Sequence, residues 1–261
     1  MKINFIGLSS FMIENEGGFR ICVDPFNDSP EWTLGPTFPK QFNGQPFGAN
    51  IVLMSEPDAD HANAPGDWLY HAPRTKPNSN PFPGLNLRGT VIYEWSGDVN
   101  VAYNYTVDGI RLLHLADNAH ILTKGQLKEI GKIDVLFISP SKVKLDGKDD
   151  ETVIKNISLL KSKVVIWSHH IVPQDLPSTE SFSELTKYFA GYFKANASSN
   201  RNYKNEDSFI ELCYVLENAM TLNRKYNGII IDEPTLNIGR NFLADIKKKP
   251  KTILFKKMLA A

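Results

Sequence analysis

The sequence predicts an α/β fold made of many short strands, with most of its helices in the second half of the chain. Runs rich in β-branched and aromatic residues favour strands at 3–6, 19–23, 51–54, 90–94, 101–107, 110–115, 135–138 and 164–167. Helical periodicity is poor before residue 120 and improves afterwards, over 123–130, 152–160, 182–193 and 208–222. Because short strands must pair, we expect sheets first, followed by strands mixed with helices.

Composition and charge narrow the class of protein. Of the 261 residues, 42% are hydrophobic and 11% aromatic, as in an ordinary globular protein, which excludes a disordered or fibrous chain. The 29 basic and 29 acidic residues balance, so no global field attracts nucleic acid or a membrane surface. We therefore expect a small molecule as the partner, and we interpret the lysine-rich run 247–251 as solvated surface.

The cysteines and the start of the chain bear on the compartment. Cys22 and Cys213 fit neither a metal-binding spacing nor a disulfide framework, so buried free thiols and a cytoplasmic location are expected. The apolar segment 1–13 contains Asn4 and is followed by no small-residue cleavage site, which favours a strand over a signal peptide. No apolar run approaches membrane-spanning length.

Acidic residues and a histidine follow the predicted strand 51–54. Glu56, Asp58, Asp60 and His61 come after it, and the chain turns between them at a proline. The carboxyl ends of strands are where α/β folds usually place their ligands, so these side chains are expected to converge there.

Two later strands end in the same kind of residue. Asp117 and His120 follow the strand 110–115, which contains His114, and an Asp-Gly turn precedes that strand. His169 and His170 follow the strand 164–167. Three strand ends therefore offer side chains that can bind a metal.

Each of these residues also has a structural interpretation. Asp58 and Asp60 can cap a helix that begins just after them, because an aspartate there accepts backbone N–H bonds. A lone Glu56 beside proline is usually solvated. His114, inside an apolar strand, is more often a core or supporting histidine than a ligand, and His120 has no assigned role.

Five blocks of the sequence form a longer pattern when they are taken in order. They are Gly7-Leu8-Ser9-Ser10-Phe11, Val23-Asp24-Pro25-Phe26, His114-Leu115-Ala116-Asp117-Asn118-Ala119-His120, Glu129-Ile130-Gly131-Lys132-Ile133-Asp134-Val135-Leu136 and Val165-Ile166-Trp167-Ser168-His169. The set resembles the metallo-β-lactamase superfamily, and most of all its single-domain branch related to ascorbate-phosphate lactonases. An ordered set is far more specific than any single motif.

The resemblance implies a fold and a domain plan. The fold would be a four-layer αββα sandwich, with two mixed sheets face to face and helices outside. We expect a single domain over 1–261, in which 1–175 form the matched core and 176–261 a helical elaboration with closing strands.

The resemblance also implies a metal site, in a changed form. The family motif His-x-His-x-Asp-His falls on Glu56, Asp58, Asp60 and His61, so its first two histidines are replaced by carboxylates. Asp117 matches the bridging aspartate. The branch also has a histidine where this chain has Leu8, and glycines where it has alanines at 116 and 119.

The family ligands can be carried over residue by residue. One metal position keeps Asp60, His61, Asp117 and His169, of which the two aspartates are the catalytic candidates. The other position has only the carboxylate candidates Glu56, Asp58 and Glu94. Four further residues would support the ligands or contact substrate: Asp24, His114, His120 and His170.

The donor types predict the cofactor and the function. One or two divalent ions are expected, with imidazoles suiting Zn²⁺ or Fe²⁺ and carboxylates suiting Mg²⁺ or Mn²⁺. The resemblance implies a metal-dependent hydrolase of a small-molecule ester, lactone or phosphoester. The alternative is an inactive superfamily member that acts as a ligand-binding or regulatory protein.

Overall fold

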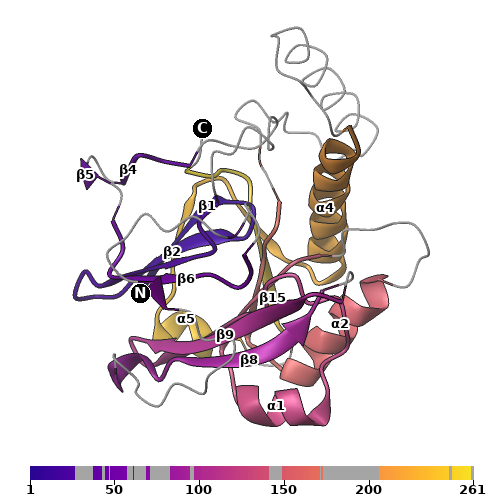
Figure 1. Cartoon of the computed structure of the whole chain (residues 1–261), viewed down its shortest axis with the longest axis horizontal. Coiled ribbons are helices and arrows are strands. Elements are labelled where there is room, and N and C mark those ends of the chain that lie inside the picture. Colours follow the sequence, from indigo (N-terminus) through magenta and orange to yellow (C-terminus); the bar gives the residue numbers. More distant parts are fainter. Residues whose placement is uncertain are drawn as a thin grey trace, which may run out of the picture.

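Two β-sheets lie face to face in this protein, as Figure 1 shows for the computed structural model. The structure describes residues 1–26, 38–42, 45–46, 48–57, 61, 69–70, 83–94, 97–140, 149–170, 172, 206–246 and 249–259. Asp58, Asp60 and the predicted helix 182–193 lie outside these residues.

The first sheet has six strands in the order β14-β1-β2-β3-β6-β7. β1, β2 and β3 pair in antiparallel fashion, whereas β3, β6 and β7 run parallel, so this sheet is mixed. Its strands are β1 (Lys2–Gly7), β2 (Ser10–Glu14), β3 (Arg20–Val23), β6 (Ile51–Leu53), β7 (Leu69–Tyr70) and β14 (Thr235–Asn237). The strand predicted at 3–6 lies within β1, and the segment 1–13 spans two strands, β1 and most of β2, because the chain turns at Leu8, which has a φ of 52°.

The second sheet has seven strands in the order β13-β15-β12-β11-β10-β9-β8. β8, β9 and β10 pair in antiparallel fashion. β10, β11, β12, β15 and β13 are parallel neighbours. Its strands are β8 (Arg88–Tyr93), β9 (Val99–Val107), β10 (Ile110–His114), β11 (Val135–Ile138), β12 (Val164–Trp167), β13 (Ile229–Ile231) and β15 (Lys251–Phe255). A short hairpin of β4 (Gln41–Phe42) and β5 (Gln45–Pro46) stands apart, and the 3₁₀ turn η1 (Pro83–Leu85) precedes β8.

Helices cover the outer face of the second sheet. These are α1 (Lys124–Ile130), α2 (Asp149–Leu160) and α4 (Glu206–Lys225), whose apolar residues pack in one cluster with β10, β11, β12 and β15. Thr123 caps α1 in a capping box with Gln126, which explains why the helix begins there. The short helix α5 (Arg240–Ala244) instead adds Leu243 to the core between the sheets.

The inner faces of the sheets share one apolar core. Phe11 of β2 lies 4.7 Å from Phe137 of β11, measured between ring centroids, and both are buried. Alternate residues of β9, such as Tyr103 and Tyr105, point into the same core. This arrangement confirms the predicted α/β sandwich of two mixed sheets with helices outside.

The outer face of the first sheet differs from that of the second. Its apolar cluster includes Met12, Cys22 and Val52 from strands, with Phe26 and Phe38 from loops. Among the residues that the structure describes, no helix belongs to this cluster. Nor is any helix in the described part of the chain long and apolar enough to cross a membrane.

Candidate metal centre

The chain turns sharply where its central strands end. Asp24 after β3, Ala116 after β10 and His169 after β12 have φ values of 44°, 47° and 61°, in the left-handed region that non-glycine residues seldom adopt. Leu8, between β1 and β2, does the same at 52°. Such strained residues cluster at functional sites.

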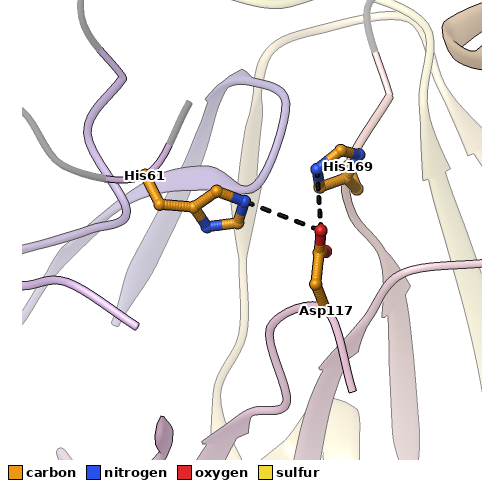
Figure 2. Close-up of side chains that lie close together, drawn as sticks. All are labelled: His61, Asp117 and His169. Carbon is orange, nitrogen blue, oxygen red and sulfur yellow. Dashed lines mark ion pairs between the residues drawn. The ribbon is translucent and has the colours of Figure 1, made fainter. Parts of the chain in front are cut away.

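Three side chains from separate segments meet beside these turns. His61 Nε2 lies 3.8 Å from Asp117 Oδ2, and His169 Nε2 lies 3.1 Å from the same oxygen (Figure 2). The two imidazole rings are stacked, with centroids 5.4 Å apart. All three side chains are buried, and one ligand atom from each lies within 4.8 Å of the others. We call His61, Asp117 and His169 the histidine-aspartate cluster.

A buried carboxylate behind this cluster fixes the orientation of His61. Asp24 Oδ2 accepts hydrogen bonds from His61 Nδ1 at 2.8 Å and from His114 Nε2 at 2.6 Å. The backbone N–H of Ser55 donates to the other oxygen at 2.7 Å, and its hydroxyl donates to Oδ2 at 2.8 Å. Because Nδ1 of His61 holds its proton toward Asp24, Nε2 is the nitrogen turned toward the cluster, as in metal-binding histidines.

The charge state of Asp24 follows from these contacts. Burial alone would raise the pKa of Asp24, but the positive charges and hydrogen bonds of His114 and His61 outweigh burial and hold it well below its usual range. Asp24 is therefore an ionised acceptor.

Carboxylates lie on the other side of His61. Glu56 Oε1 lies 2.7 Å from His61 Nε2, and Glu56 Oε2 accepts a hydrogen bond of 2.7 Å from Asn100 Nδ2. Glu56 and Asn100 are both buried. A carboxylate oxygen and an imidazole lone pair repel each other, so a proton or another cation must lie between Glu56 and His61. We call Glu56, Glu94 and Asn100 the carboxylate side.

Glu94 follows β8 and is half-buried. Its pKa rises to about 8, because burial, the hydrogen bond and charge of Glu56, and the charge of Asp117 outweigh the hydrogen bond of Asn100. At neutral pH and without a metal, Glu94 therefore holds its proton. Glu56, Glu94 and Asp117 therefore lie close enough together for their charges to interact.

Two predicted residues do not join the histidine-aspartate cluster. His120 is exposed, and its carbonyl accepts a hydrogen bond from Asn156 Nδ2 at 3.0 Å. His170 is buried in the core, where it stacks on Phe5 at 4.6 Å and contacts the Phe255 carbonyl oxygen through Nε2 at 3.3 Å. Burial lowers the pKa of His170 to about 4, so it is neutral. Adjacent residues of a strand end point to opposite sides, which separates His170 from His169.

Sequence reasoning missed Ser55 and Asn100. Ser55 lies beside the predicted Glu56, but a lone serine carries little signal by itself. Asn100 is one of two asparagines in β9, and only the structure shows that it is buried and therefore needs a partner.

The donor set of the histidine-aspartate cluster fits a divalent cation. Imidazole nitrogens and a carboxylate oxygen are the usual ligands of Zn²⁺. The carboxylates of Asp24, Glu56 and Asp117 would favour any cation there. A cation would also resolve the contact between Glu56 and His61. The residues present therefore fit one ion, held by His61, Asp117 and His169.

A two-sheet sandwich with a histidine-aspartate cluster at its strand ends defines a class of metallo-hydrolase folds. The model of the beta-lactamase superfamily domain matches residues 2–169. This chain belongs to that family, which confirms the resemblance to metallo-β-lactamases. A search of curated protein sequences found no significant match.

Two solved structures resemble this chain. A protein of the metallo-β-lactamase superfamily from Thermotoga maritima is 20% identical over 98% of both chains, with a TM-score of 0.55. A metallo hydrolase from Ignicoccus hospitalis is 16% identical over 74% of this chain and 91% of that one, with a TM-score of 0.49. At 20% identity, the likeness to the Thermotoga protein concerns the fold alone.

Proposed function

We propose that this protein is a metal-dependent hydrolase with one divalent ion in the histidine-aspartate cluster. The observation that carries the proposal is the convergence of ligand atoms from three separate segments within 4.8 Å. Asp60, which precedes His61 and matches the family motif, would be the fourth ligand. Such a convergence at strand ends is the usual form of a catalytic centre.

The donors favour particular ions. Two imidazoles favour Zn²⁺ or Fe²⁺ at the cluster, and the oxygens of the carboxylate side would suit Mg²⁺ or Mn²⁺ as a second ion. A bound ion would lower the pKa of a water molecule and polarise a carbonyl or phosphoryl oxygen. Asp117, with Asp60, would orient that water and accept its proton. Asp24 would keep Nε2 of His61 directed at the ion.

The substrate proposed is a small-molecule ester, lactone or phosphoester. This class comes from the family resemblance, and the neutral overall charge supports a small molecule over nucleic acid or a membrane. We expect the protein to act in the cytoplasm, because its two cysteines suggest no disulfide framework.

One contact favours a second function. Glu56 lies 2.7 Å from His61 Nε2, so a single proton between them can satisfy both groups without any metal. In that state the protein would be an inactive superfamily member that binds a ligand or regulates a partner.

Metal analysis separates the two functions. The protein, purified without a metal-affinity tag, is analysed for bound elements, stripped, and titrated with Zn²⁺, Mn²⁺, Fe²⁺ and Mg²⁺. We expect one equivalent of a transition ion, with affinity falling more than about 100-fold in Asp117→Ala and His169→Ala, since even supporting residues are worth about 10 to 100-fold. Stoichiometric binding would justify screening lactones and phosphoesters for hydrolysis.

Two further variants sharpen this test. His114→Phe keeps an aromatic ring near Asp24 but removes no proposed ligand, so it should retain one equivalent of metal. Glu56→His combined with Asp58→His restores the family motif and should add a second equivalent of Zn²⁺. Failure of the wild-type protein to bind any of the ions would support the ligand-binding alternative and reject the hydrolase.

A further inference from the structure

A groove lined by lysines lies at the end of the second sheet opposite the histidine-aspartate cluster. It has a volume of about 780 Å³ and lies between the ends of α2 and α4, which lie next to each other on the outer side of the sheet (Figure 1). The segments before β12, β13 and β15 complete its wall. The cluster lies at the carboxyl ends of the parallel strands, whereas this groove lies at their amino ends. We call it the lysine groove.

The charge of the lysine groove has one sign. Four lysines line it, Lys161, Lys163, Lys225 and Lys249, and no aspartate or glutamate is among the described residues of its wall. Nζ of Lys163 already donates to the Leu243 carbonyl at 3.1 Å. The side chains of the other three lysines make no hydrogen bond or ion pair with the described residues, in a protein whose total charge is zero. A concave site lined by one sign of charge concentrates ions of the opposite sign.

Polar and apolar groups complete the lining. Ser162 is 5% exposed, and its hydroxyl has no hydrogen-bond partner among the described residues, so it can donate to a ligand. Ile157 and Ile246 supply apolar surface, and Tyr226 is partly buried beside them. A volume of this size, with apolar walls and a few polar groups, is typical of small-molecule sites.

We propose that the lysine groove binds a small molecule that carries phosphoryl groups on an apolar or aromatic body. Lysine is a common point-charge partner of phosphate, whereas planar carboxylates are matched by the fork of arginine, and no arginine is among the described residues of the wall. The lysine-rich run that begins at residue 247 contributes Lys249 to this site. The proposal is independent of the hydrolase function, because the two sites lie at opposite ends of β12.

Binding of two probes tests the proposal. Full-length protein in EDTA is titrated by calorimetry with inorganic pyrophosphate and with ADP, which adds an aromatic body to the same anion. We expect both to bind and ADP to bind more tightly. The double variant Lys161→Gln and Lys225→Gln should weaken ADP binding at least tenfold, and Ser162→Ala should weaken it less. Lys132→Gln, at an exposed lysine outside the groove, is the matched control and should change affinity less than twofold.

Other results would overturn the proposal. If pyrophosphate and ADP bound with equal affinity, the apolar or aromatic body would have no part in recognition. Absence of binding would mean that the lysines only offset the negative ends of α2 and α4. Loss of binding in Asp117→Ala, with full binding in the lysine double variant, would place the anion at the histidine-aspartate cluster instead. Far-ultraviolet circular dichroism of each variant verifies that it is folded.

Discussion

The histidine-aspartate cluster and the carboxylate side, which meet at His61, satisfy their charges in different ways. On the cluster side, His61 and His169 turn nitrogens toward Asp117, and Asp24 holds His61 from behind. On the carboxylate side, Glu56 contacts Glu94, His61 and Asn100, and Glu94 has a pKa of about 8. The first arrangement could hold a cation, whereas in the second a proton on Glu94 and the amide of Asn100 offset the crowded carboxylates. Carboxylates that lie close together at the strand ends therefore do not all have the same role.

Removal of the Asp24 carboxylate should have the largest effect on stability and metal affinity. In the wild-type protein, His61, His114 and Ser55 all donate hydrogen bonds to Asp24 in a buried site. The amide of Asp24→Asn has one oxygen acceptor, so some of these donors would lose their partner. The free energy of unfolding should fall by about 3–5 kcal/mol, the cost of breaking a buried charge pair. Metal affinity should fall by about 10 to 100-fold.

Urea denaturation of metal-free protein and zinc titration measure these two effects. Asp245→Asn, at an exposed aspartate after α5, is the control and should change stability by less than about 0.5 kcal/mol. Equal stability of the two variants would show that Asp24 does not hold the site together.

Removal of Asn100 should affect the carboxylate side alone. In Asn100→Ala the buried Oε2 of Glu56 loses its amide donor. The free energy of unfolding should fall by about 1–3 kcal/mol, as expected for a buried acceptor left without a partner. One equivalent of metal should still bind. Asn237→Ala, on an exposed strand residue, is the control, and a loss of metal in Asn100→Ala would contradict the division into two sides.

The raised pKa of Glu94 predicts a smaller, pH-dependent effect. Between its ordinary value of 4.5 and about 8, the folded metal-free protein keeps a proton that the unfolded chain has released. The free energy of unfolding should therefore fall as pH rises through this window and level off above it. When denaturation is measured in EDTA from pH 5 to 9, the free energy of unfolding should fall less steeply in Glu94→Gln than in the wild-type protein. Identical slopes would mean that Glu94 does not retain the proton.

The smallest effect is expected at His120. Its side chain is exposed and outside the histidine-aspartate cluster, although it belongs to the same sequence block as Asp117. His120→Ala should change the free energy of unfolding by less than about 0.5 kcal/mol. Zinc affinity should change less than twofold. A large loss of zinc would return His120 to the site.

Strand positions in the middle of the chain were predictable because their signals are local. Val135–Ile138 and Val164–Trp167 are strands over the predicted residues, and the Asp-Gly turn at 108 and 109 joins β9 to β10 as expected. Thr123 caps the start of α1, at the residue where the helical periodicity of the sequence also begins. Such elements are set by nearby residues, either through β-branched runs or through a side-chain cap.

The C-terminal strands depend on partners far away in the sequence. β15 follows a lysine run that suggests surface, yet it inserts between β12 and β13 in the second sheet. β14 joins β1 at the edge of the first sheet, more than 200 residues distant in the chain. Pairings of this kind are fixed by burial within a sheet that already exists, so a local pattern carries little of that information.

Short ordered motifs in the sequence are enough to predict the family of the fold and to place Asp117 and His169 just after β10 and β12. Only the tertiary structure decided which neighbours share a site. It brought His61, Asp117 and His169 together, placed Asp24 behind them, and turned His170 into the core and His120 to solvent. The physical reason is that metal ligation and charge compensation depend on distances of a few ångströms between segments, and those distances are set by how two sheets pack.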